Sequence, residues 1–259
     1  MQELNIIQWL VLAIVQGITE YLPVSSSAHL ILVSEIMKWQ DQGLLMDIAA
    51  HAGSLIAVLI YFKEELIKLI KGKNWYLFKQ LILASIPLAL IGLIFASYIE
   101  TNLRKPLIIA ISSVIFGVLL YFSDTYQKKK KQTISKIGFK HAIIIGIGQA
   151  FALIPGASRS GVTMTAALAL GYSRTQAARF SFLLAIPALL MTTAYGILKL
   201  YQQPTQTNIL GATVIFSVSF IVSYLSIKVF LQLIERIPMS FFMWYRIVLA
   251  IFLIIWFVL

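Results

Sequence analysis

The sequence contains no cysteine and few charged residues, and each absence excludes a class of protein. Without cysteine there is no disulfide framework, no thiolate chemistry and no cysteine-based zinc site. Charged residues make up only 12% of the 259 residues, whereas hydrophobic residues make up 59% and the mean hydropathy is +0.88. This apolar surface exceeds what a soluble domain of this length can bury. The composition therefore predicts an integral membrane protein.

Acidic residues are scarce as well. Ten Asp and Glu residues face 21 Lys and Arg residues, which gives a net charge of +11. A basic balance of this kind can indicate nucleic-acid binding, but the basic residues do not interleave with exposed aromatic residues, and we expect no nucleic-acid partner. The charge is interpreted mainly as loops that face an anionic leaflet.

Long apolar runs predict six transmembrane helices, because a span needs about 20 apolar residues. Two further apolar regions, 4–38 and 141–171, are interrupted in the middle by polar stretches, and each is predicted to be a re-entrant pair of short helices. The predicted fold class is thus an all-α integral membrane protein. The expected spans are 47–62, 77–99, 107–122, 175–198, 207–230 and 238–258.

The two interrupted regions predict an internal repeat. Pro23 and Pro155 each follow an apolar helix and precede a serine segment, and three spans follow each pair. An odd number of elements inverts the second copy, so we expect an inverted-topology repeat whose two loops meet near the bilayer midplane. The expected parts of this single membrane domain are residues 1–122, a basic linker at 123–140, and residues 141–259.

Basic residues predict the orientation. Under the positive-inside rule the basic loops face the cytoplasm. In the six-span arrangement one side carries all four basic loops, at 63–79, 128–140, 174–179 and 228–236. We therefore expect the opposite side to be outside, with both termini, the Arg104–Lys105 turn and the loop at 200–206.

The first polar stretch is GITEYLPVSSSAHLI, residues 17–31. Gln16 and Glu20 are four residues apart and share a helix face that points at the loop. An intramembrane carboxylate is costly without a partner and marks a functional site. The alternatives are a carboxylate that reaches the interface and, for Gln16, a plain interhelical hydrogen bond.

Beyond the proline, Ser25, Ser26 and Ser27 offer hydroxyls, and backbone N–H groups at the start of the next helix would point at an anion. His29 lies on the first turn of that helix. A histidine there could act as nucleophile or general acid/base, because its pKa lies near operating pH. A satisfied core histidine is the alternative.

The second polar stretch is ALIPGASRSGVTM, residues 152–164. Arg159 stands between Ser158 and Ser160, with glycines on both sides and Thr163 following. A guanidinium fork, hydroxyls and unencumbered backbone donors are typical of a phosphate-binding segment. A structural arginine paired with a carboxylate is the alternative.

Together these residues predict one site inside the bilayer that is open to water on one side. One cation, one carboxylate, one histidine and several hydroxyls suit phosphoryl chemistry on a substrate whose tail stays in lipid. Three further buried polar residues, Asp47, His51 and Arg246, are expected either to support the site or to form simple interhelical hydrogen bonds.

The segments QGITEYLPVSSSAHL, PGASRSGVTMTAALALG and ARFSFLLAIPALL resemble the hallmark segments of the undecaprenyl-diphosphate phosphatase family, also called bacitracin-resistance proteins. The similarity runs nearly end to end. That family's fold is the inverted repeat with two re-entrant hairpins. The resemblance implies removal of the terminal phosphate from undecaprenyl diphosphate, which gives the monophosphate carrier used in peptidoglycan synthesis.

The resemblance also implies the residue roles. The family's acidic motif falls on Gln16 and Glu20, and its Ser/His element on Ser26 and His29. Its serine–arginine–serine element falls on Ser158, Arg159, Ser160 and Thr163. A divalent cation, Mg²⁺ or Ca²⁺, is expected at Glu20 with Gln16 nearby. The expected setting is the bacterial cytoplasmic membrane, with the site open to the extracytoplasmic side. The sequence leaves a homodimer open.

Several alternatives remain at this point. Ser26 activated by His29, His29 itself, or a metal-bound water could attack the phosphorus. Inverted repeats with broken helices are also typical of secondary transporters, so a lipid or small-anion transporter is the alternative function. A second membrane phosphatase superfamily has SRxxxHxxxD, but Thr163 and Ala167 stand where its histidine and aspartate should be.

Overall fold

The computed structural model describes residues 5–39, 43–130, 137–202 and 208–257, and this part of the chain is all-helical. Six helices are long and apolar enough to cross a membrane, as predicted, which makes the chain a multi-pass membrane protein. They are α3 (Leu44–Tyr61), α5 (Trp75–Tyr98), α6 (Pro106–Lys130), α9 (Arg174–Gln202), α10 (Ile209–Leu233) and α11 (Met239–Phe257).

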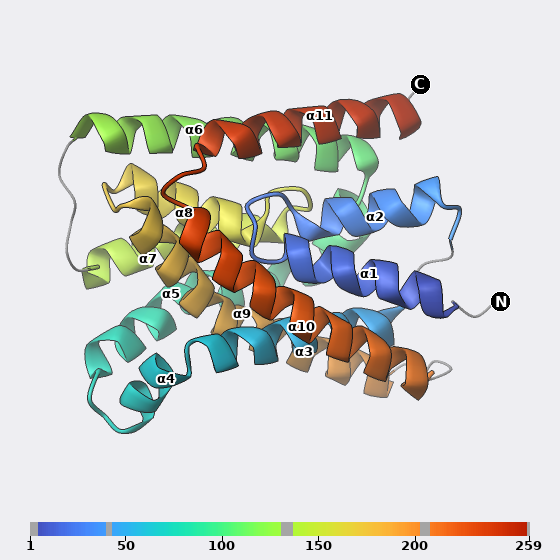
Figure 1. The fold of residues 1–259 in the computed structure, drawn as a ribbon, viewed down its shortest axis with the longest axis horizontal. Helices are drawn as coiled ribbons and strands as arrows, with labels where there is room; N and C mark the ends of the chain where they lie inside the picture. The colour runs from blue at the N-terminus through green and yellow to red at the C-terminus, as the bar shows by residue number, and fades with distance from the viewer. Residues whose placement is uncertain (1–4, 40–42, 131–136, 203–207, 258–259) are drawn as a thin grey trace.

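The two interrupted regions each form a pair of short helices. The first pair is α1 (Ile6–Thr19) and α2 (Ser26–Ile36), and the second is α7 (Phe139–Ala150) and α8 (Arg159–Ala169), with a short 3₁₀ turn η2 (Phe151–Leu153) between them. Both breaks contain a proline, which disfavours helical backbone at the residue before it. The two joining loops lie near the middle of the molecule along the direction of the long helices (Figure 1).

Helices from the two halves of the chain interleave. The most extensive contacts are between α3 and α10, followed by α6 with α11 and α5 with α7, while α1 packs on α10 and α8 packs between α6 and α9. Glycine permits the closest approaches: a Cβ on Gly53 of α3 would lie 2.4 Å from the Phe216 carbonyl oxygen, and one on Gly146 of α7 the same distance from that of Ala84. The loops are therefore held between tightly packed helices.

Two features differ from the expected connections. α6 continues to Lys130, well beyond residue 122 and into the predicted linker, because buried Asp124 forms an ion pair with Arg174 of α9 and another with Lys128 one turn on. The rest of the linker includes residues 131–136, which lie outside the described residues. The basic segment after α3 also forms a helix, α4 (Lys63–Ile70), followed by the first turn of α5.

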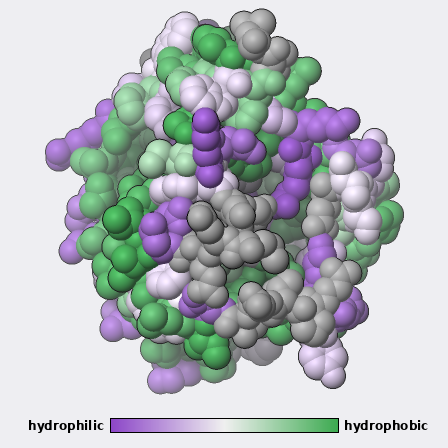
Figure 2. Space-filling model, turned by 90° about the vertical axis from the view of Figure 1, so that its right-hand side faces the viewer, coloured by the Kyte–Doolittle hydropathy of each residue, from purple (hydrophilic) through white to green (hydrophobic). Residues whose placement is uncertain are grey.

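The outside of the helical bundle is apolar. Large hydrophobic side chains on every long helix are exposed, as expected for surfaces that meet lipid. Figure 2, seen from the end that carries both termini, shows hydrophobic side chains reaching the margin of the molecule on several sides. The short π-helical turn η1 (Ile99–Leu103) joins α5 to α6 at the same end as the termini (Figure 1).

Candidate active site

Glu20 joins the two loops. It follows the last turn of α1 and is 8% exposed. Arg159 of α8 donates to Glu20 Oε1 over 2.9 Å, and the Ser26 hydroxyl donates to Glu20 Oε2 over 3.3 Å. Gln16 donates to the same Oε2 over 2.9 Å, as its spacing predicts. One carboxylate thus contacts the first turns of both α2 and α8, and the two predicted halves of the site meet.

Arg159 is held from several directions. Its guanidinium donates to the Ser181 carbonyl of α9 over 3.1 Å and lies 5.7 Å from the centre of the Tyr21 ring. The Arg159 and Glu20 side chains are 11% and 7% exposed, so their ion pair is largely shielded from water. Removing one partner of such a pair would leave an uncompensated charge. The arginine is therefore paired with a carboxylate that also accepts a hydrogen bond from Ser26 of the first loop.

The N-terminal residues of α2 and α8 have matching geometry. Ser25 and Ser158 are the N-caps, and both have positive φ, 74° and 68°. Such backbone costs on the order of 1–3 kcal/mol for a residue with a side chain, so it is found where surrounding structure enforces it. The hydroxyls of Ser25 and Ser27 are 3.3 Å apart, and those of Ser158 and Ser160 are 3.2 Å apart. Each loop therefore places a pair of serine hydroxyls at a helix N-terminus.

Ser160 and Thr163 are fully buried and bond to protein groups. Ser160 donates to the Leu22 carbonyl of the first loop over 2.8 Å. Thr163 bonds to the Ser181 hydroxyl over 2.6 Å and can donate to the Arg159 carbonyl over 2.8 Å. These contacts fix α8 against the first loop and α9, and the predicted contact of both hydroxyls with phosphate stays a prediction.

His29 does not contact Ser26 through a hydrogen bond among those of the described residues. Its Nδ1 lies 2.6 Å from the Ser25 carbonyl, so Nδ1 carries the proton and donates. In the neutral ring Nε2 then accepts from the Tyr245 hydroxyl of α11, whose ring stacks on His29 at 5.6 Å. Of the described hydrogen bonds, Ser26 therefore has one to Glu20 and none to His29, and the three alternatives for the attacking group stay open at this point.

Arg246 of α11 is fully buried and serves the loops rather than a carboxylate. It donates to the Gly156 carbonyl over 2.7 Å, to the Ala157 carbonyl over 3.1 Å and to the Pro23 carbonyl over 3.4 Å. A fourth bond reaches the Ser113 carbonyl of α6 over 2.9 Å. Irregular backbone at membrane depth needs donors for its carbonyls. Of the two alternatives left by the sequence, the structure places Arg246 in support of the site.

The other two polar residues that were predicted to be buried, Asp47 and His51, lie on α3 and are only half-buried. His51 Nδ1 donates to the Asp47 carbonyl one turn earlier over 2.8 Å, which is a bond within the helix. Tyr245 and Ser181 complete the site but were not predicted as site residues. Ser181 lies within the ARFSFLL segment quoted above, and Tyr245 directly precedes Arg246. Both residues therefore stand in or beside segments that the sequence analysis had singled out. Nothing in those segments indicated that the two side chains contact the loops.

A divalent cation fits this site in part. The described residues contain no group of three or more His, Cys, Asp or Glu side chains that could hold a metal ion. Glu20 supplies one carboxylate, and the buried Gln16 Oε1 has no hydrogen-bond partner in the structure. Hard cations bind such oxygens and often take the remainder from substrate phosphates. The donor set therefore suits a cation that arrives with a diphosphate.

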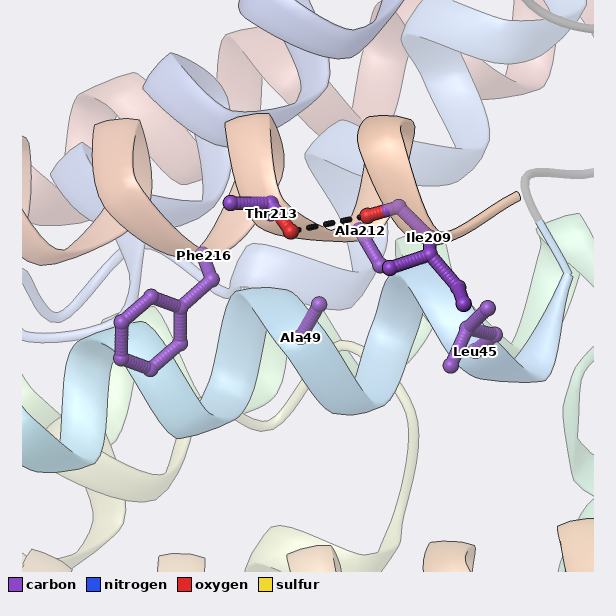
Figure 3. A pocket seen from close by; sticks show the side chains of 6 residues that line it. All are labelled: Leu45, Ala49, Ile209, Ala212, Thr213 and Phe216. Atoms are coloured by element: carbon purple, nitrogen blue, oxygen red, sulfur yellow. Dashed lines mark hydrogen bonds between the residues drawn. The ribbon is translucent and has the colours of Figure 1, made fainter. Parts of the chain in front are cut away.

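A groove elsewhere on the protein has different chemistry. It lies between α3 and α10 and is lined by Leu45, Ala49, Ile209, Ala212, Thr213 and Phe216 (Figure 3). Its one hydroxyl, on Thr213, donates to the Ile209 carbonyl over 2.8 Å (Figure 3). An apolar lining of this kind does not bind phosphate, so the polar site between the loops is the candidate active site.

These features define a class: a multi-pass helical membrane protein with a buried carboxylate, guanidinium and serine site between two broken helices. A family model described as "Bacitracin resistance protein BacA" matches residues 9–252, and the chain belongs to this family. A relative from Teredinibacter turnerae is 45% identical, over 97% of this chain and 99% of its own length, and is named undecaprenyl-diphosphatase. Relatives with the same name from Alcanivorax borkumensis and Saccharophagus degradans are 44% and 42% identical over 96% and 98% of this chain, covering 98% and 100% of their own lengths.

Proposed function

We propose that this protein is an undecaprenyl-diphosphate phosphatase, which hydrolyses the lipid diphosphate to the monophosphate carrier and inorganic phosphate. The names of its full-length relatives support this activity. The observation that carries it is the Glu20 carboxylate, which touches both a serine hydroxyl and the arginine. Within the apolar bundle, Glu20 thereby brings together a hydroxyl that can act as nucleophile, on Ser26, and a guanidinium that can bind phosphate, on Arg159. Glu20 itself can accept the proton.

The contacts favour Ser26 as nucleophile and Glu20 as its base. The Ser26 oxygen forms a bond to the terminal phosphorus, the bond from that phosphorus to the bridging oxygen breaks, and Glu20 receives the hydroxyl proton. The lipid monophosphate leaves with the bridging oxygen, which takes the proton from Glu20 and so restores the carboxylate. Water then cleaves the Ser26–phosphorus bond, returns a proton to the serine oxygen and releases inorganic phosphate.

Arg159 stabilises the phosphoryl group in transfer. Negative charge spreads over three equatorial oxygens, and a planar guanidinium can meet two of them at once. The serine hydroxyls and backbone N–H groups at the two helix N-termini add donors for the same anion. A Mg²⁺ or Ca²⁺ ion would be held by Glu20 and Gln16, where it would neutralise part of the diphosphate charge.

The same proposal includes the architecture and orientation expected from the sequence: two re-entrant hairpins in an inverted repeat of residues 1–122 and 141–259, divided by the basic linker at 123–140. The matching N-caps Ser25 and Ser158 support it, as does the packing of α1 on α10 and of α7 on α5. The basic segments support a cytoplasmic face at the α4 end, in the bacterial cytoplasmic membrane. The site then opens to the extracytoplasmic side, where the termini lie.

Phosphate release from undecaprenyl diphosphate by the purified protein in detergent tests the activity. We expect Ser26→Ala to abolish release while Ser217→Ala, an exposed serine of α10, leaves it unchanged. A Ser26→Ala protein with near-normal turnover would refute the serine mechanism. Transport of the lipid without any phosphate release by the unaltered protein would refute the phosphatase and favour the transporter.

A further inference from the structure

The surface formed by α4 and the first turn of α5 has an unusual composition for a loop between two spans. Ile67 is 47% exposed and Ile70 is 86% exposed, whereas Leu69, on the opposite face of α4, is buried in the core. Trp75 follows at 57% exposure. Exposed apolar groups of this size mark an interaction site. We refer to residues 63–79 as the α4 surface.

The same surface is strongly basic. It carries five lysines, and all of them are exposed: Lys63, Lys68, Lys71, Lys73 and Lys79. Within the described part of the chain none of these lysines forms an ion pair, while Glu65, one of the two acidic residues present, pairs with Arg179. The positive charge of the α4 surface is therefore largely uncompensated.

Aromatic side chains extend the α4 surface toward α7. Trp75 packs edge-on against Phe78 at 5.3 Å, and Tyr76 lies 4.5 Å from the ring of Phe139. Tyr76, Phe78 and Phe139 are 45%, 40% and 38% exposed. Aromatic rings at the ends of spans are typical of the membrane–water boundary, where one part of the ring is apolar and another is wet.

We propose that the α4 surface is a docking site for the head groups of anionic phospholipids, with α4 lying in the plane of the leaflet. Position and charge both favour a lipid over a soluble partner. α4 directly joins spans α3 and α5, so it lies at the membrane boundary by chain connectivity. Its isoleucines then reach acyl chains while its lysines reach phosphates, the arrangement of an interfacial amphipathic helix.

The α4 surface also contacts α9, the helix whose Ser181 holds Arg159 in the candidate active site. Glu65 of α4 pairs with Arg179 of α9, whose guanidinium lies 5.5 Å from the Phe62 ring. Two residues further along α9, Ser181 contacts Arg159 and Thr163. The α4 surface thus anchors the same end of α9 from which Arg159 is held.

A cysteine probe tests where Ile70 lies, because the chain has no other cysteine. Ile70→Cys labelled with an environment-sensitive fluorophore, in nanodiscs of phosphatidylglycerol and phosphatidylcholine, should be quenched by spin labels on lipid acyl chains. Quenching by aqueous iodide alone would place the residue in water. That result would overturn the proposal and favour a soluble acidic partner.

Lipid selectivity tests the charge. In mixed nanodiscs we expect Lys68→Gln/Lys71→Gln to lower the ratio of phosphatidylglycerol to phosphatidylcholine retained on the protein by about fivefold or more, because each lysine near a membrane contributes about a fivefold factor. Arg104→Gln/Lys105→Gln, which removes two exposed charges at the other end, should change it by less than about twofold. Lys68→Arg/Lys71→Arg should retain the preference. An unchanged ratio in the glutamine variant would refute the proposal.

Discussion

At the scale of single residues, the site depends on a few side chains that each make several contacts. Glu20 receives hydrogen bonds from three side chains, and Arg246 supplies donors to carbonyls of both loops. A substitution at either position removes several interactions together, so effects within the site should not add.

Arg159→Lys should retain the charge and much of the substrate binding yet lose turnover. An ammonium is a point charge and cannot meet two phosphoryl oxygens in one plane. By analogy with arginine fingers we expect kcat to fall on the order of a thousandfold or more. Arg104→Lys, an exposed arginine between η1 and α6, is the matched control. Near-normal kcat for Arg159→Lys would limit this arginine to holding the loop.

The Gln16–Glu20 pair should respond asymmetrically. Glu20→Gln removes the proton acceptor from Ser26, and kcat should fall by about 10²–10⁴. Gln16→Glu leaves Glu20 in place, so phosphate release should be retained. Because it adds a second carboxylate beside Glu20, the activity should depend more steeply on divalent cation. Titrations of Mg²⁺ and Ca²⁺ against phosphate release measure both effects. A Glu20→Gln enzyme that responds to metal as the unaltered protein does and keeps its kcat would contradict both assigned roles.

Tyr245→Phe isolates the hydrogen bond to His29 while keeping the ring stack. Loss of a bond of this kind changes stability by only about 1 kcal/mol. If the bond sets the orientation of His29 for catalysis, kcat should fall severalfold, and Tyr245→Phe should have little further effect in a His29→Ala background. Additive losses in this double-mutant cycle would show that the two residues act independently.

At the scale of helices, the sequence was sufficient for the spans and their interruptions but not for the contacts across them. Apolar runs marked the six long helices, and Pro23 and Pro155 marked the two breaks. The α4 helix was missed because an eight-residue amphipathic segment gives no run of span length. The end of α6 was missed because its helicity depends on the Asp124–Arg174 pair, which hydropathy cannot show.

For the candidate site, the sequence likewise indicated the residues but not the contacts between them. The residues of the two loops were found because polar groups within apolar runs are conspicuous. The bond between His29 and Tyr245 joins residues 216 positions apart, and no periodicity relates them. The Glu20–Ser26 contact was missed for another reason: a histidine near a serine gives a familiar nucleophile–base pairing, whereas the loop geometry turns the serine toward the carboxylate.

Arg246 links α11 to both loops and to α6, so its removal should destabilise several elements at once. Arg246→Met leaves buried carbonyls without donors, at a cost of about 1–3 kcal/mol for each such group. We expect a clearly lower melting temperature in detergent for Arg246→Met and an intermediate one for Arg246→Lys. The exposed Arg236→Met provides the control. Equal melting temperatures for all three variants would show that the two loops are stable without the hydrogen bonds from Arg246.

At the scale of the whole molecule, the orientation is open to a direct measurement because the chain lacks cysteine. Arg104→Cys should react with a membrane-impermeant maleimide added to intact cells stripped of the outer envelope. Lys129→Cys should react only after lysis, because the positive-inside rule places the end of α6 in the cytoplasm. The reverse pattern would invert the whole molecule and direct the site to the cytoplasm.

The Glu20–Arg159 ion pair has a consequence for the order of events in a catalytic cycle. A site that holds one carboxylate and one guanidinium in contact is electrically neutral at rest, so an arriving diphosphate binds by anion exchange: it must displace Glu20 from part of the arginine. Its several negative charges favour the exchange, and the released carboxylate is then free to accept a proton. The lipid product carries one phosphate fewer and competes less well for the guanidinium. Return of Glu20 to Arg159 would therefore expel the product and limit its inhibition of the next turnover.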